Sequence, residues 1–276
     1  MSNRPLGVRA HDLAVDSIEA LISRLRKYQL SAIQLAPTKS FPKEVNDINA
    51  FSLEQASYYG ACLREAKIEV TVLGCYVNLS SYDTAVRQDA IETFCHYIDL
   101  ASSLNAKFVG TETGSVLTGY TQENYSEEAY ELMIASLQTI ARYGERQGVS
   151  VALEAGINHP LHDVATIERV LVDCQSDNLV VLFDLVNLLT EVNSHQQQEL
   201  LEASFASFGH KIKVIHLKDC QFIEGEKVTF PLGQGVVDYP LLMSYIRKMK
   251  EQPQLLLDEI PEGDLAMSIR FLQSWL

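Results

Sequence analysis

Four ionisable side chains each stand at or near the end of a short apolar segment of the sequence. They are Glu154, Asp184, His216 and Glu259, and the segments before them read Val-Ala-Leu, Val-Leu-Phe, Val-Ile and Leu-Leu-Leu-Asp. Burial of such groups is costly unless they share a polar site. Three carboxylates and one imidazole that converge form a ligand set suited to Mn²⁺, Mg²⁺, Co²⁺ or Zn²⁺. The four residues, which we call the ligand set, therefore predict one divalent metal ion as a cofactor.

The apolar segments alternate with longer amphipathic segments along the whole chain. Strands are predicted at residues 6–10, 32–35, 69–76, 107–111, 150–154, 179–184, 212–216 and 254–258. Between and after them, helical spacing is present, and candidate N-caps are Asp16, Asp163, Asp238 and Asp264. Short, mostly apolar strands are typical of parallel sheets buried on both faces. Eight strand–helix units predict an α/β fold, a single-domain (β/α)8 TIM barrel spanning residues 1–276 as one catalytic domain.

In such a barrel the carboxyl ends of all strands meet at one mouth, where active sites lie. The ligand set falls on the last four predicted strands, which are neighbours around half the barrel. Four further side chains near this mouth are candidates for binding substrate, namely Glu112, His159, Asn187 and Lys218. Lys218 is expected to pair with a ligand carboxylate or with a substrate phosphate. Weaker candidates at the same ends are His11, Gln34, Tyr76, Asn78, Thr111 and His162.

The connection after the seventh strand is unusually long. Glu224-Gly225 lies between segments of strand-like composition, which predicts a small hairpin on the rim. The following Gly233-Gln-Gly235 is either a tight turn or a loop whose backbone N–H groups hold an anion. Apolar residues of this connection, such as Phe222, are expected either to roof the site or to contact a second subunit in a homo-oligomer.

Bulk composition narrows the class of protein. The chain has 276 residues, 47% of them hydrophobic and 21% charged, and a formal net charge of −14. This charge disfavours binding to nucleic acid and gives no reason to expect a membrane partner. Five cysteines without a C-x-x-C pair indicate reduced thiols. No apolar run has the length of a signal peptide or of a membrane span, so we expect a cytoplasmic location.

The motifs around these residues resemble the xylose isomerase-like barrel superfamily of sugar and sugar phosphate isomerases and epimerases. The resemblance covers nearly the whole chain and is carried by the following motifs: Leu153-Glu154, Phe183-Asp184-Leu-Val-Asn187, His216-Leu-Lys-Asp219, Pro231-Leu-Gly-Gln-Gly235 and Asp258-Glu259. It implies that Glu154, Asp184, His216 and Glu259 hold one divalent metal ion. It also implies that Glu154 and Glu259 act as the catalytic acid and base.

The resemblance thus implies an isomerase or epimerase that acts on a small sugar or sugar phosphate by proton transfer through a cis-enediolate. The chain departs from the ketose 3-epimerase pattern at Pro160, Asn187 and Phe222, where those enzymes carry Glu, His and Arg. Three alternatives stay open at this stage. They are a metal-dependent dehydratase of a polyol or keto-polyol, an endonuclease IV-like phosphodiesterase, and a sugar or metal sensor without turnover.

Overall fold

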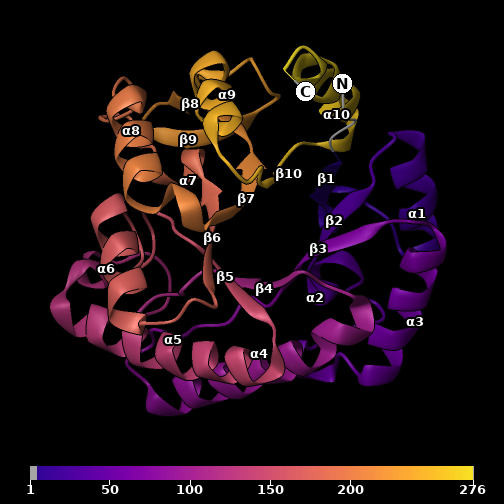
Figure 1. The fold of residues 1–276 in the computed structure, drawn as a ribbon, viewed down its shortest axis with the longest axis horizontal. Coiled ribbons are helices and arrows are strands. Elements are labelled where there is room, and N and C mark those ends of the chain that lie inside the picture. Colours follow the sequence, from indigo (N-terminus) through magenta and orange to yellow (C-terminus); the bar gives the residue numbers. More distant parts are fainter. Residues whose placement is uncertain (1–4, 276) are drawn as a thin grey trace.

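Eight parallel strands form a closed barrel in this protein, whose computed structural model describes residues 5–275. The barrel strands are β1 (Leu6–Arg9), β2 (Ala32–Leu35), β3 (Glu69–Gly74), β4 (Phe108–Thr111), β5 (Ser150–Glu154), β6 (Leu179–Asp184), β7 (Ile212–Leu217) and β10 (Gln254–Leu257). Each strand pairs with the next along the chain, and β10 closes the ring between β7 and β1. The predicted (β/α)8 barrel is confirmed (Figure 1).

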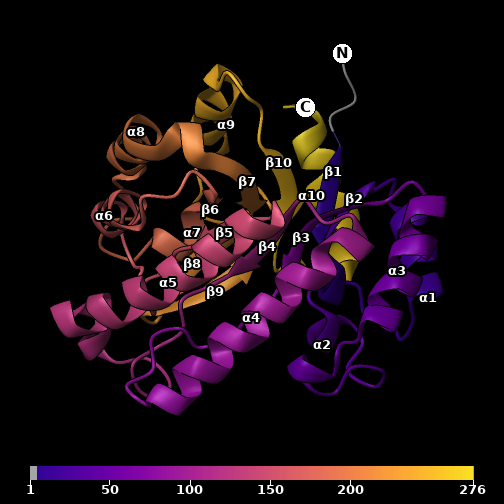
Figure 2. The ribbon, with the colours of Figure 1, turned by 60° about the horizontal axis from the view of Figure 1, so that its bottom comes forward.

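The helices surround the strands on the outside, as the two views show (Figures 1 and 2). The longer ones are α1 (Ile18–Lys27), α3 (Leu53–Glu65), α4 (Thr84–Leu104), α5 (Glu127–Gln147), α6 (Val164–Cys174), α8 (Gln197–Phe208), α9 (Tyr239–Lys248) and α10 (Glu262–Gln273). Single-turn elements are α2 (Pro37–Ser40), α7 (Leu185–Leu188), η1 (Ala10–Asp12), η2 (Ile48–Ala50), η3 (Gln122–Tyr125) and η4 (Gly209–Lys211). Within the described residues, no helix combines the length and apolarity needed to cross a bilayer.

Helix starts follow from capping side chains. Asp163 and Asp238 accept hydrogen bonds from backbone N–H groups in the first turns of α6 and α9, as predicted. At α1 the cap is Ser17 rather than Asp16, because Ser17 accepts from the N–H of Ala20. The prediction for Asp264 is wrong, since α10 begins earlier and this carboxylate lies inside its first turn. An acidic side chain there still interacts favourably with the helix dipole.

Strand alternation decides which side chains enter the barrel. Its interior is filled by a separate buried cluster of Val72, Ala152, Val180, Leu182, Val214 and Leu256. Side chains two residues apart on a strand point to the same side. The next inward positions toward the mouth are therefore Glu154 after Ala152, Asp184 after Leu182, His216 after Val214 and Asp258 after Leu256. A dry apolar floor thus lies directly beneath a ring of polar side chains.

The long connection after β7 forms an antiparallel hairpin of β8 (Asp219–Ile223) and β9 (Glu226–Phe230), which confirms the predicted hairpin. Its turn residues Glu224 and Gly225 both have positive φ angles, 53° and 85°. Two successive left-handed residues give a turn whose twist matches that of the flanking strands.

The glycine loop after the hairpin surrounds a carboxylate of the chain itself. The backbone N–H groups of Gly233 and Gly235 donate to Asp219 Oδ2 at 2.9 and 3.0 Å, and those of Cys220 and Val237 donate to Oδ1 at 2.9 and 3.1 Å. A Cβ at Gly235 would lie 2.1 Å from Asp219 Oδ1, so the close approach requires glycine. The loop does hold an anion, but that anion is the Asp219 carboxylate.

Candidate metal and substrate site

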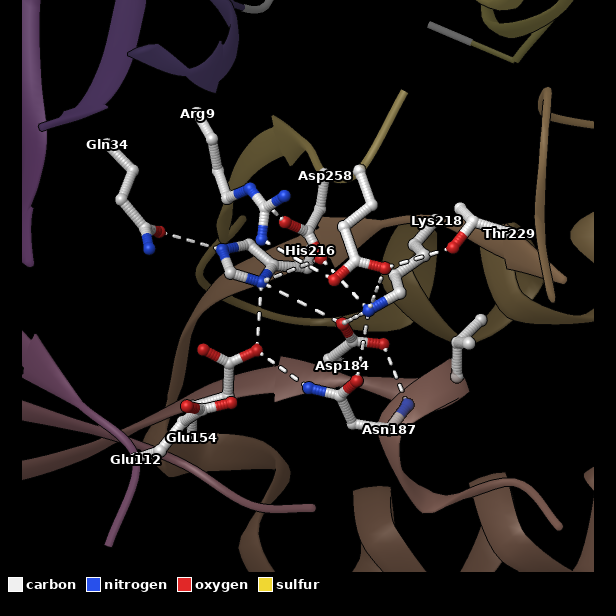
Figure 3. A network of polar contacts seen from close by, with 12 residues as sticks. Arg9, Gln34, Glu112, Glu154, Asp184, Asn187, His216, Lys218, Thr229 and Asp258 are labelled. Carbon is white, nitrogen blue, oxygen red and sulfur yellow. Dashed lines mark hydrogen bonds and ion pairs between the residues drawn. The ribbon is translucent and has the colours of Figure 1, made fainter. Parts of the chain in front are cut away.

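Three members of the ligand set converge at the carboxyl ends of β5, β6 and β7. Glu154, Asp184 and His216 are all buried, and each offers a ligand atom within 4.8 Å of the other two. His216 Nδ1 lies 3.1 Å from Glu154 Oε1 and 3.8 Å from Asp184 Oδ2. Figure 3 shows these side chains pointing toward one another. The prediction that the ends of neighbouring strands bring these groups together is confirmed for these three.

The other ring nitrogen of His216 fixes the orientation of the imidazole. Nε2 lies 2.7 Å from the amide oxygen of Gln34, an acceptor, so Nε2 carries a proton and donates it. In the neutral ring this leaves the Nδ1 lone pair facing the carboxylates, as a metal ligand requires. Burial lowers the pKa of His216, but the carboxylates of Glu154 and Asp258 raise it to about 9. With no ion bound, a proton on Nδ1 thus balances the carboxylates.

The residues present fit a divalent cation. Asp184 Oδ2 is buried and has no hydrogen-bond partner within residues 5–275. Burial raises the pKa of Asp184 to about 7, against the opposing effect of the Lys218 ammonium. A buried carboxylate oxygen without a hydrogen bond is costly unless something else satisfies it. Carboxylates with one imidazole are the ligands that Mn²⁺, Mg²⁺, Co²⁺ and Zn²⁺ accept.

Among the described residues, neither Glu259 nor its neighbour Asp258 joins the three-residue group. Glu259 lies at the edge of the site. Its side chain is 40% exposed, ion-paired with Lys218 Nζ at 2.9 Å, and accepts from Thr229 Oγ1 at 3.1 Å. Its backbone is left-handed, with a φ of 51°, a conformation that costs a non-glycine residue about 1 to 3 kcal/mol. Strained backbone of this kind is often found at functional sites.

The neighbouring residue, Asp258, takes the inward position instead. Its carboxylate is buried, and Oδ2 lies 3.7 Å from His216 Nδ1. Burial opposes ionisation of Asp258, yet His216, Arg9 and Lys218 lower its pKa to about 2. Of the two carboxylates that follow β10, Asp258 is thus the one in contact with His216, whereas Glu259 is the predicted ligand.

Two cationic side chains, Arg9 and Lys218, contact the polar cluster formed by Glu154, Asp184, His216 and Asp258. Lys218 Nζ lies 3.4 Å from Asp258 Oδ2 and 3.7 Å from Asp184 Oδ2. Arg9 Nε lies 2.6 Å from Asp258 Oδ1, and its Nη2 donates to Asp12 Oδ1 at 2.8 Å. Burial works against both charges, but the carboxylates raise the pKa values of Arg9 and Lys218 above their ordinary range. The pairing of Lys218 with ligand carboxylates agrees with one of the two expectations.

Asn187 connects the groups of the cluster. Its Nδ2 donates to Glu154 Oε1 at 2.9 Å, and its Oδ1 accepts from Lys218 Nζ at 3.1 Å. Its backbone N–H donates to Asp184 Oδ1 at 3.1 Å, which caps α7. Asn187 therefore holds the Glu154 carboxylate in place through its side chain, as Figure 3 shows.

A cavity of about 470 Å³ opens beside the cluster, and Glu112, His159, Asn187, Lys218 and Glu259 all contribute to its lining. A second cavity of about 920 Å³ adjoins it at Glu112 and His159. His159 Nε2 lies 3.5 Å from Glu112 Oε1. Burial lowers the pKa of His159, but Glu112 more than compensates, so that pKa is raised. The four residues predicted to bind substrate thus line the same cavity as Glu259.

The remaining candidates divide into two groups. Gln34 and Tyr76 belong to the cluster, since the Gln34 amide also donates to the Tyr76 hydroxyl. His162 lies elsewhere, with its ring 4.3 Å from that of Tyr125. Sequence analysis missed three residues, Arg9, Asp12 and Asp258. The signal for Asp258 was present in the alternation, because it stands two residues beyond the inward-facing Leu256.

The fold agrees with comparisons to known proteins. Residues 22–275 match the family model described as xylose isomerase-like TIM barrel, and the chain belongs to that family. Among curated proteins, none matches the sequence.

Three solved structures illustrate the range of similar barrels. D-psicose 3-epimerase from Clostridium cellulolyticum H10 is 14% identical, with 99% of each chain covered and a TM-score of 0.76. The probable 3-DHS dehydratase AsbF from Bacillus anthracis is 14% identical, with 98% of each chain covered and a TM-score of 0.75. The IOLI protein, solved with a zinc atom, is 16% identical, with 99% of each chain covered and a TM-score of 0.76. At these identities the likeness concerns the fold.

Proposed function

We propose that the protein is a metal-dependent isomerase or epimerase that acts on a small sugar or sugar phosphate. The observation that carries this proposal is the convergence of Glu154, Asp184 and His216 at the barrel mouth, beside a cavity that Glu259 also lines. We assign the divalent ion to these three residues and to Asp258, whose carboxylate takes the fourth inward position. When bound, the ion would act as a Lewis acid that polarises the substrate carbonyl.

The proton transfers fall to two glutamates that differ in their surroundings. Glu154 is buried, and its Oε1 is held by Asn187 and His216. Glu259 is partly exposed, and its Oε2 contacts Lys218 and Thr229. One carboxylate accepts the proton of the carbon next to the carbonyl, and the other returns a proton. Return to the neighbouring carbon gives isomerisation, and return to the opposite face of the same carbon gives epimerisation.

Three residues support these transfers. Lys218 places an ammonium beside Glu259, where it stabilises a carboxylate and negative charge that develops on a substrate oxygen. Asn187 prevents Glu154 from rotating away from the centre. The Glu112–His159 pair lines the same cavity, where it can donate to and accept from sugar hydroxyl groups.

Solvent deuterium exchange tests the proposal directly. Purified protein supplied in turn with Mn²⁺, Co²⁺, Mg²⁺ or Zn²⁺ is incubated in D₂O with a panel of ketoses, aldoses and their phosphate esters. We expect deuterium at the carbon next to the carbonyl of a substrate that keeps its heavy atoms. Glu154→Gln and Glu259→Gln should each abolish exchange while leaving the circular dichroism spectrum unchanged.

Two results would count against the proposal. A product that has lost water would indicate a dehydratase on this scaffold. Failure of the metal-loaded wild-type protein to exchange deuterium into any member of the panel would leave the proposed proton transfer without support. Lys43→Gln, which removes an exposed lysine that pairs with Asp16, serves as a neutral control.

A further inference from the structure

One face of the β8–β9 hairpin is directed into the substrate cavity. Phe222 is the direct cross-strand partner of Lys227, and Cys220 is that of Thr229, so these four side chains share one face of the hairpin. Phe222, Lys227 and Thr229 line the cavity of about 470 Å³. On the other face, Val228 is exposed, consistent with the strand alternation. This face of the hairpin therefore contributes one apolar, one cationic and one hydroxyl side chain to the cavity lining.

Among the residues that the structure describes, Lys227 is not paired with a carboxylate. Its Nζ donates to the backbone carbonyl of Val186 at 2.7 Å, and no carboxylate within residues 5–275 lies at ion-pair distance from it. The side chain is partly buried, and burial lowers its pKa below the ordinary value. An ammonium has three N–H donors, and the printed contact uses one of them. The remaining hydrogen-bonding capacity is open to a ligand.

The other charges of the inner cavity are already paired. Glu259 pairs with Lys218, and Glu112 faces His159. The two further carboxylates of the lining, Glu191 and Glu226, are exposed at the rim. Lys227 is thus a partly buried cation without a carboxylate partner in a cavity whose inner carboxylates have theirs. Burying such a cation costs free energy unless an anion pairs with it.

We propose that Lys227 binds an anionic group of the substrate, a phosphate ester or a carboxylate, and thereby selects charged sugars over neutral ones. This inference rests on the proposed function for the identity of the ligand as a sugar. The geometry suits it, because Lys227 and Thr229 are alternate residues of one strand and Thr229 hydrogen-bonds the Glu259 carboxylate. A substrate could then present its reacting carbons near Glu259 and its anionic end to Lys227. Phe222 would pack against the intervening carbons.

Calorimetric binding of matched probes tests the assignment. The probes are D-ribulose, its terminal phosphate ester and D-glucuronate, each titrated with Mn²⁺ and again with EDTA, which separates attraction to the ion from attraction to the lysine. A hydrogen bond to a charged group is worth roughly 10- to 100-fold in affinity. We expect wild-type protein to bind one anionic probe at least about 10-fold more tightly than D-ribulose. The anion that shows the preference identifies phosphate or carboxylate.

Three variants assign the preference to the side chain. Lys227→Met should reduce affinity for the anionic probe to that for D-ribulose, without changing the latter. Lys227→Arg should retain the preference. Lys213→Gln is the matched control, because Lys213 is a partly buried lysine at the start of β7 that already pairs with Glu251 at 2.6 Å. It should behave as wild type.

Three results would overturn the assignment. They are equal affinity for anionic and neutral probes, binding of no probe, and an anion preference that persists in Lys227→Met. The experiment needs no turnover, so its failure is distinguishable from failure of the proposed function. An anion preference that depends on Lys227, in a protein that exchanges no deuterium, would refute the proposed proton transfer and leave the anion site standing.

Discussion

Neutralising Asp258 should weaken metal binding far more than neutralising its neighbour Glu259. The two residues are adjacent in sequence, yet their carboxylates lie in different surroundings. Asp258 is buried with Oδ2 at 3.7 Å from His216 Nδ1, whereas Glu259 is 40% exposed and faces Lys218 and Thr229. The pair Asp258→Asn and Glu259→Gln preserves size and removes one charge at each position.

The difference in magnitude follows from distance and screening. Unit charges about 4 Å apart interact by about 4 kcal/mol at an effective dielectric constant of about 20. Asparagine keeps one oxygen as a weaker ligand, so we expect Asp258→Asn to cost about 3 kcal/mol, or roughly 100-fold in Kd. The exposed Glu259 acts through a screened environment, where one charge is worth about 1 kcal/mol or less. Glu259→Gln should therefore change Kd less than about 10-fold.

The Kd of Mn²⁺ for each variant is measured by titrating the metal-free protein with Mn²⁺. Binding is followed by calorimetry or by electron paramagnetic resonance of the free ion. His216→Ala provides the reference for loss of a ligand, and Lys43→Gln the reference for no effect. If Glu259→Gln weakened binding as much as Asp258→Asn, the alternation argument would be wrong. The fourth ligand would then be Glu259, as the sequence motif predicts.

The remaining predictions concern the structure around the site. Asp219→Ala leaves four backbone N–H groups without their acceptor and should lower the free energy of unfolding by about 3 kcal/mol or more in a urea titration; a loss under about 1 kcal/mol would contradict the role assigned to this carboxylate. Leu256→Ala removes part of the barrel interior and should cost about 2 to 5 kcal/mol, whereas exposed Val228→Ala should cost under about 0.5 kcal/mol by the same titration. Burial opposes both charges of the Glu112–His159 pair, yet the pair lowers the pKa of Glu112 and raises that of His159. The pair therefore stabilises the folded protein at pH values between the pKa of Glu112 and that of His159. This stabilisation is lost as pH rises through the raised pKa of His159 or falls through the lowered pKa of Glu112. Glu112→Gln should lower the pKa of His159 in an NMR titration, and an unchanged pKa would show that the pair is not formed.

The fold could be predicted because its signal is local and repeated. Strands such as 150–154 and 179–184 are predicted to the residue, since an apolar run between polar segments has few alternative interpretations. Helix starts were harder. Ser17 and Asp16 are both good caps, and α10 begins after Pro261 without a side-chain cap, so the helix start depends on how the preceding loop approaches.

The site was predicted only as far as strand ends could be located. Asp184 and His216 fall within their strands, so strand alternation predicts that their side chains point inward. At β10 the strand ends at Leu257, and the backbone turns left-handed at Glu259, which places Asp258 inward and Glu259 along the rim. Counting from Leu256 by alternation selects Asp258, and the motif selects Glu259. The position of Arg9 beside Asp258 could not be predicted from its own segment. It depends on the pairing of β1 with β10, two strands far apart in the sequence.

The groups proposed to hold the ion and the group proposed to select the substrate come from different parts of the fold. The groups that would hold the ion come from inward positions of β5, β6, β7 and β10, which the closed barrel places in fixed register over an apolar floor. Phe222 and Lys227, which face the cavity, come instead from a hairpin outside the strand–helix repeat. Loops on the rim vary without disturbing the barrel, and that is where specificity is usually placed. A barrel that shares the strand-end residues but lacks a cation at the position of Lys227 should therefore perform related proton transfers on uncharged substrates.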